Sequence, residues 1–221
     1  MPFVDLSHVI TAGMTTYPGL PGPVIDAHLT FAASRAVYAP GTEFQIGRIS
    51  MVANTGTYLD TPAHRYPDGH DLAGLALERC VDLPALVVDR SATAHPVDES
   101  VLDGVDAADL RGAALLVRTD WDRHWGSAAY GDADHPHVTA AAARALVEAG
   151  VALVGIDSVN IDDTRTGDRP AHSILLAAGI PVVEHLTRLD RLPRNGFRFT
   201  AVPPAIAGLA TFPVRAYAVL G

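Results

Sequence analysis

Cysteine is nearly absent from the sequence, in which Cys80 is the single example among 221 residues. One cysteine excludes an intrachain disulfide and every zinc site built from several thiolates. A metal ion in this chain would therefore be held by histidine, carboxylate or amide oxygen. We expect Cys80 itself to be a small buried hydrophobic residue.

Basic residues are also scarce. Lys and Arg number 16 against 25 Asp and Glu, and the formal net charge at pH 7 is -9. Nucleic acids and anionic lipids are bound by clustered Lys and Arg, which are scattered here, so we expect neither partner. No stretch approaches the ~20 apolar residues that a membrane helix requires. The sequence predicts a cytoplasmic protein with a small-molecule substrate.

Length and composition predict one domain, which should span residues 1–221. The chain has 48% hydrophobic and 19% charged residues, which suffices for one well-buried core, and it is short for two independent domains. Short segments that are apolar or β-rich, several of them ending in polar residues, predict strands. These segments cover residues 24–31, 43–52, 81–90, 113–119, 151–156, 180–183, 197–202 and 215–220.

Two segments predict the principal helices. Residues 140–149 are amphipathic, with Thr139 as the N-cap and Gly150 as the stop signal. Residues 170–178 begin at Pro170, which suits the first turn of a helix because its missing N–H would be unpaired there anyway.

Residues 54–64, with the sequence NTGTYLDTPAH, concentrate groups able to bind a metal or move a proton. Pro62 removes a backbone donor and Gly56 permits a left-handed backbone, so we do not expect a plain helix here. The polar side chains are expected to converge from a strand end and a loop. Active sites are often built in this way, although a polar surface loop has a similar composition.

Other polar and aromatic residues have simpler interpretations. Trp121 and Trp125 lie at helical spacing, which favours packing in the core over stacking on a substrate. His70 lies in a turn and is expected to be a solvated loop residue. Asp157 follows a predicted strand, where it either hydrogen-bonds the loops around a site or completes a turn.

The segment 54–64 resembles the signature H-x-G-T-H-x-D-x-P-x-H of the kynurenine formamidase and cyclase family of metal-dependent hydrolases. The two signature histidines are replaced here by Asn54 and Tyr58. The positions that match are Gly56, Thr57, Asp60, Pro62 and His64.

The resemblance extends over nearly the whole chain, from Asp5 to Leu220. Its second half includes the segment PAHSILLAAGIPVVEHL, which contains His172 and Glu184 in the order that the family has. The resemblance implies a single α/β domain with a mixed, partly barrel-like sheet and two main helices, in the swivelling β/β/α arrangement. It also implies a homodimer or a homotetramer, in line with the prevalence of symmetric assemblies.

The family's metal site gives roles to four retained residues. In the family, the signature histidines and the aspartate hold one metal, and the aspartate bridges to a second metal that a later histidine and glutamate complete. The resemblance therefore places Asp60, His172 and Glu184 at the second metal. It makes His64, the last residue of the signature, the general acid/base.

The two replacements weaken the first metal site. Asn54 offers one neutral carbonyl oxygen as a candidate ligand, and Tyr58 offers a phenol whose pKa of about 10 disfavours a ligating anion. We therefore expect one Zn or Mn ion, or none. With a metal in place, Tyr58 would hydrogen-bond the oxyanion while His64 moves the proton.

These roles suit hydrolysis of a small cyclic or aryl amide, including N-formylkynurenine, from which formate is released. Two alternatives from other classes remain. One is a metal-free cyclase or lyase that uses Tyr58, His64 and Asp60 as acid/base groups. The other is a non-catalytic member that binds a small molecule in the same pocket, against which the retained ionisable residues argue, because burying unpaired charge is costly.

Overall fold

The computed structural model describes residues 2–92 and 96–221. Their strands form one nine-stranded sheet and a separate two-stranded ribbon, made of β2 (Val24–Leu29) and β3 (Ile46–Ser50). The strands of the main sheet are β1 (Phe3–Asp5), β4 (Tyr58–Asp60), β5 (Leu83–Asp89), β6 (Ala114–Arg118), β7 (Leu153–Ile156), β8 (Val182–Glu184), β9 (Phe197–Thr200), β10 (Thr211–Pro213) and β11 (Tyr217–Leu220).

The two longest helices confirm the helix predictions. The α-helices are α1 (Phe31–Ser34), α2 (Ala107–Leu110), α3 (Ala140–Ala149) and α4 (Pro170–Ala177). The side chain of Thr139 caps α3, and Gly150 ends it with a left-handed φ of 74°. The 3-10 helices are η1 (Pro62–His64), η2 (Leu72–Gly74), η3 (Leu77–Arg79), η4 (Glu99–Leu102), η5 (Trp121–His124), η6 (Ala128–Gly131) and η7 (Leu189–Arg191).

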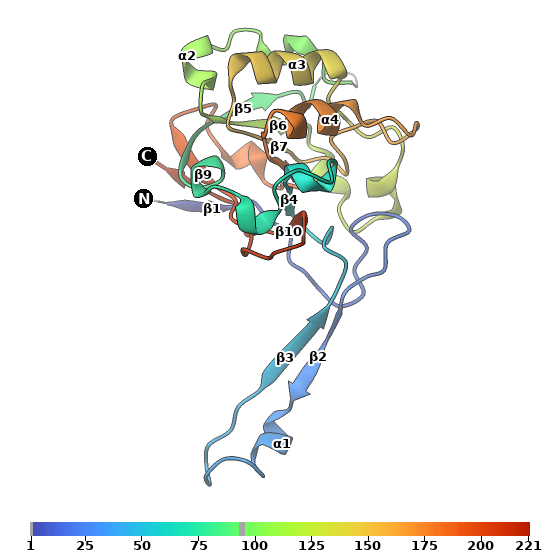
Figure 1. Cartoon of the computed structure of the whole chain (residues 1–221), viewed down its shortest axis with the longest axis vertical. Coiled ribbons are helices and arrows are strands. Elements are labelled where there is room, and N and C mark those ends of the chain that lie inside the picture. The colour runs from blue at the N-terminus through green and yellow to red at the C-terminus, as the bar shows by residue number, and fades with distance from the viewer. Residues whose placement is uncertain (1, 93–95) are drawn as a thin grey trace.

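The main sheet is mixed and curled into a half-barrel, which confirms the expected fold class (Figure 1). Its strand order is β1-β11-β9-β5-β6-β7-β8-β4-β10. Strands β5 to β8 pair in parallel, and the pairs on either side of them are antiparallel. Because β1 pairs with β11, both ends of the chain lie side by side.

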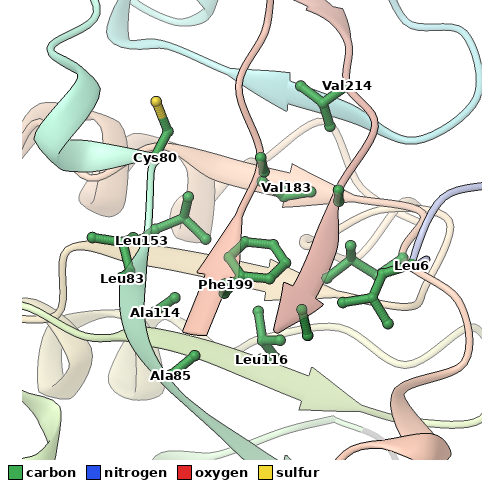
Figure 2. Close-up of a cluster of buried hydrophobic side chains, with 14 of the residues drawn as sticks. Leu6, Cys80, Leu83, Ala85, Ala114, Leu116, Leu153, Val183, Phe199 and Val214 are labelled. Carbon is green, nitrogen blue, oxygen red and sulfur yellow. The ribbon is translucent and has the colours of Figure 1, made fainter. Parts of the chain in front are cut away.

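The parallel strands are buried on both faces. Successive side chains of a strand point to opposite faces, so Leu115 and Val117 of β6 pack in the cluster that includes α3 and α4. Ala114 and Leu116 enter the other cluster, inside the curl, with Phe199 of β9 (Figure 2). This double burial explains why these strands read as continuous apolar runs in the sequence.

The ribbon of β2 and β3, with the connection between them, forms an arm over residues 24–50 that projects from the body (Figure 1). Its large apolar side chains are exposed. Ile25 lies opposite Ile49, and their exposed fractions are 47% and 48%. Both strands were predicted, but the sequence did not show that they leave the body.

The remaining strand predictions are confirmed, with bounds that differ from the observed ones by at most two residues. Strands β1, β4 and β10 were not predicted, because each has three residues and their segments contain proline or polar residues. Cys80 is fully buried, as expected. None of the helices within the described ranges has the length and apolar character of a membrane span. The cytoplasmic location and the expected lack of nucleic-acid and lipid partners stay predictions.

Candidate active site

Strands β4, β8 and β10 bring the two halves of the predicted site together. Tyr58 of β4 lies opposite Glu184 of β8, and Asp60 of β4 lies opposite Thr211 of β10. His64 follows in the short helix η1. The expected convergence of polar side chains from a strand and the following loop is therefore what the structure shows.

Asp60 and Glu184 both lie close to the ring of His172. His172 Nε2 lies 3.7 Å from Asp60 Oδ2 and 3.6 Å from Glu184 Oε1. All three side chains are buried. Neither Asp60 Oδ2 nor His172 Nε2 has a hydrogen-bond partner among the described residues. Because buried polar atoms are normally satisfied, these two point to a ligand held between them.

The donor set fits a divalent metal ion. One imidazole nitrogen and two carboxylates form a mixed N/O set of the kind that Zn²⁺ and Mn²⁺ accept. Ligand atoms of Asp60, His64 and His172 lie within 4.8 Å of one another as well. Glu184 Oε1, buried and 3.6 Å from His172 Nε2, is a further candidate for the third ligand beside His64, whose side chain is 35% exposed.

The ionisable groups in the cluster shift one another's pKa values. Burial would lower the pKa of His172, but its interactions with Asp162 and Asp60 raise it to about 10. Burial raises the pKa of Glu184 to about 7, despite the nearby His172. Burial would also raise the pKa of Asp60, but His172 and His64 lower it. A positive charge among these carboxylates, from imidazolium or a cation, therefore stabilises the site.

Asp162 fixes the orientation of His172. Its Oδ2 lies 2.7 Å from His172 Nδ1, and its carboxylate accepts hydrogen bonds from the backbone N–H groups of Ala171 and His172 at the start of α4. With Nδ1 engaged, Nε2 is left to face Asp60 and Glu184. This role of Asp162 was not predicted from the sequence, where the only signal for it is a carboxylate shortly after a buried strand.

Tyr58 acts as a donor within the site. Its hydroxyl donates to Glu184 Oε2 at 2.7 Å. Burial, followed by the charges of Glu184 and Asp60, holds its pKa well above the usual value, although an interaction with Asn54 opposes this. A phenol has one proton to donate. Tyr58 is therefore not free to donate to an oxyanion, contrary to the expectation from the sequence, and Asn54 contacts this phenol.

Thr211 links Asp60 to His64. Its hydroxyl donates to Asp60 Oδ1 and lies 2.9 Å from His64 Nδ1. Because threonine has a single hydroxyl proton, the hydrogen in the second bond belongs to His64 Nδ1. This tautomer leaves Nε2 of a neutral His64 without a proton. Thr211 was not identified from the sequence.

Three further expectations have different outcomes. The carboxylate of Asp157 accepts hydrogen bonds from the backbone and hydroxyl of Thr119, so it holds the end of β6, as in the first of the two roles considered. His70 is exposed, as expected.

The core assignment of Trp121 and Trp125 was wrong, because both side chains are half-buried and lie outside the two core clusters. Trp125 lines a cavity of about 670 Å³.

His8 and His185 contact aromatic residues that line this cavity, and they were not singled out from the sequence. The His8 ring stacks on Trp125 with a centroid distance of 3.8 Å, and the His185 ring lies 5.8 Å from that of Trp125. Burial lowers the pKa of His8 to about 4 and that of His185 to about 3. Both imidazoles are therefore neutral at pH 7.

Fold and site together define an α/β protein with a buried candidate site for a divalent cation. The chain belongs to the cyclase family, whose model, described as "Putative cyclase", matches residues 4–163. This confirms the resemblance found in the sequence.

Similar proteins match this chain in sequence or structure over nearly its whole length. The kynurenine formamidase of Salinibacter ruber is 29% identical over 220 residues, which cover 98% of this chain and 96% of that protein. The kynurenine formamidase of Bacillus cereus is 26% identical, with coverage of 97% and 95%. Isatin hydrolase A from Ralstonia solanacearum superposes with a TM-score of 0.82 at 25% identity, covering 100% of this chain and 92% of that one.

Replacing Asp162 with asparagine should weaken binding of Zn²⁺ about 10–100-fold, because residues that orient a metal ligand contribute to affinity by that amount. The amide oxygen of asparagine can still accept a hydrogen bond from a backbone N–H at the start of α4, so the helix should remain folded. The measurement is competition with a chromogenic chelator after metal removal. Asp163→Asn is the matched control, since Asp163 pairs with Arg165 near the surface. Equal affinities in Asp162→Asn and the wild type would contradict this role.

Proposed function

We propose that this chain is a metal-dependent hydrolase that cleaves the C–N bond of a small aryl or cyclic amide, as an arylformamidase does with N-formylkynurenine. The observation that carries the proposal is the meeting of Asp60, His172 and Glu184 around buried atoms without partners. Sequence and structural similarity to kynurenine formamidases and to an isatin hydrolase supports this reaction class.

Asp60, His172 and Glu184 would hold one Zn²⁺ or Mn²⁺ ion. When bound, the ion lowers the pKa of a water molecule and polarises the amide carbonyl. One ion is proposed rather than two, because Tyr58 presents a neutral phenol that is hydrogen-bonded to Glu184. Asn54 likewise offers only a neutral amide where the family has an imidazole.

His64 is proposed as the group that transfers the proton. Its Nε2 accepts a proton from water as the water oxygen bonds to the carbonyl carbon. His64 then gives this proton to the nitrogen as the C–N bond breaks, so that an aryl formamide yields an amine and formate. Thr211 keeps His64 in the tautomer that this step requires. The partial exposure of His64 allows a substrate to approach it from solvent.

Protein purified without added metal should contain about one equivalent of Zn or Mn per chain, bound by the mixed N/O set. Asp60→Ala should lose it, because the variant lacks a buried ligand. Elemental analysis measures the content, and His70→Ala, in an exposed loop, is the control. Two equivalents in the wild type would show that Asn54 and Tyr58 support a second ion. An active protein without metal would instead favour the metal-free cyclase or lyase.

The wild type should release formate from N-formylkynurenine, and His64→Gln should lower kcat about 10²–10⁴-fold, because it removes the general acid/base. Metal content should stay unchanged, since the three buried ligands remain. The assay follows formation of kynurenine by its absorbance, with His70→Gln as the matched control at an exposed histidine. An unaltered kcat in His64→Gln would rule out its proton-transfer role.

We also propose that the chain self-associates through the arm of residues 24–50, with a second copy as the partner. A two-stranded ribbon is marginally stable alone in water, and large exposed apolar surfaces mark interfaces. The arm exposes Ile25, Ile49 and Phe44, the last with an exposed fraction of 52%. Symmetric homo-oligomers are the commonest assemblies, which favours a second copy over a different chain.

Replacing Ile25 and Ile49 together with glutamate should convert the assembly to monomers, because an interface that buries unpaired charges loses stability. Size-exclusion chromatography with light scattering gives the mass. Leu77→Glu is the control, since Leu77 is 59% exposed on the body rather than on the arm. A monomeric wild type, or a double variant with unchanged mass, would exclude this interface.

A further inference from the structure

A buried donor lies next to the proposed metal ligands. His185 directly follows Glu184 and is fully buried, and its Nε2 has no hydrogen-bond partner among the described residues. Its backbone adopts a left-handed φ of 58°, which is uncommon outside glycine. Strained positions of this kind cluster at functional sites, so the conformation itself calls for an explanation.

Hydrogen bonding determines which nitrogen of His185 carries the proton. Tyr130 Oη lies 2.8 Å from His185 Nδ1, and both groups are buried. A buried phenol donates its proton to an acceptor, and Nδ1 is the acceptor that the described residues offer to Tyr130. A neutral imidazole carries one proton, which must then be on Nε2. The unpartnered atom is therefore an N–H donor.

The backbone holds His185 in place from the opposite side. The Thr57 hydroxyl donates to the carbonyl oxygen of His185 at 2.6 Å and accepts the backbone N–H of His8 at 3.0 Å. The signature residue Thr57 thus ties the amino-terminal segment to the residue that follows Glu184. A rigidly held donor without an acceptor is costly, because burial removes the hydrogen bond that it would make to water.

His185 connects the metal cluster to an aromatic wall. Its ring lies 4.9 Å from that of Tyr58, whose hydroxyl contacts Glu184. On another side it approaches Tyr130 and Trp125, at 5.7 and 5.8 Å, and both residues line the cavity of about 670 Å³. Polar residues, among them Thr11, Thr16 and Ser127, complete the lining of this cavity, and its size suits a small ligand.

We propose that His185 is a substrate-binding residue whose Nε2–H donates a hydrogen bond to the carbonyl oxygen of the amide, with the aryl group of the substrate against Trp125 and Tyr130. The inference rests on the proposed function and adds a residue to it. The hydroxyl proton of Tyr58 is already donated to Glu184, so the hydrogen-bond donor for the substrate is supplied by His185 instead. Negative charge grows on this oxygen as water adds, so the bond strengthens in the transition state.

The test compares His185→Phe with His185→Gln in the metal-loaded enzyme. Phenylalanine keeps a ring but removes the donor, so kcat for N-formylkynurenine should fall about 100–1000-fold, with KM changed little, as for the loss of an oxyanion donor. Glutamine places an amide N–H at a similar distance and should restore most of kcat. His70→Phe is the matched control at an exposed histidine, and metal content is measured in each variant.

Equal losses in His185→Phe and His185→Gln, or an unchanged kcat in His185→Phe, would overturn the inference. A second measurement is independent of turnover: nitrogen-15 NMR of labelled histidine should show the proton of His185 on Nε2, and its signal should shift when formanilide is added. A proton on Nδ1, or no shift with formanilide, also overturns the inference. Failure of the wild type to hydrolyse both N-formylkynurenine and isatin would overturn the proposed function, whatever the NMR result.

Discussion

The antiparallel register of β4 against β8 is the constraint on which the candidate site depends. Tyr58 and Glu184 are 126 positions apart in the chain, and only sheet pairing makes them neighbours. Directly opposite residues share a face, and so does Asp60, two positions further along β4. A slip by one residue would turn these side chains to the other face. The parallel strands β5 to β8 support this edge because both of their faces are packed.

The polar cluster persists in a buried position because its neighbours satisfy most of it. Ionised groups removed from water are stable only when they are paired and hydrogen-bonded. Asp162 holds one side of His172, the backbone N–H of Ile161 donates to Glu184, and Thr211 donates to Asp60. The atoms of this cluster that remain without a hydrogen-bond partner are Asp60 Oδ2 and His172 Nε2, which face each other at its centre. This distribution is the one that the proposed cation site requires.

The two replacements in the family signature change the hydrogen bonding inside the site. A phenol at position 58 donates to Glu184 where the family has an imidazole that binds metal. The ring of Tyr58 also packs beside His185, which joins the cluster to the wall formed by Trp125 and Tyr130. Retention of Asp60, His172 and Glu184 beside these changes is what a reduced metal site with a different set of hydrogen-bond donors would require.

The sequence by itself determined the family, the α/β class, the two principal helices and the identities of Asp60, His172 and Glu184 as candidates. Those inferences rest on local signals: caps at Thr139 and Gly150, short apolar runs, and a motif whose Gly56 adopts the left-handed φ of 67° that glycine permits. Such signals depend on neighbours in the chain, so they can be read without the fold.

Only the tertiary structure decided the contacts of Asp162, Thr211 and His185, the position of Trp125 at a cavity, and the departure of the arm from the body. Thr211 meets His64 across 147 positions, and His185 meets Tyr130 across 55. Hydrogen bonds of this kind depend on which groups are left without a partner once the sheet has closed. That depends on packing in three dimensions, which no local pattern of residues records.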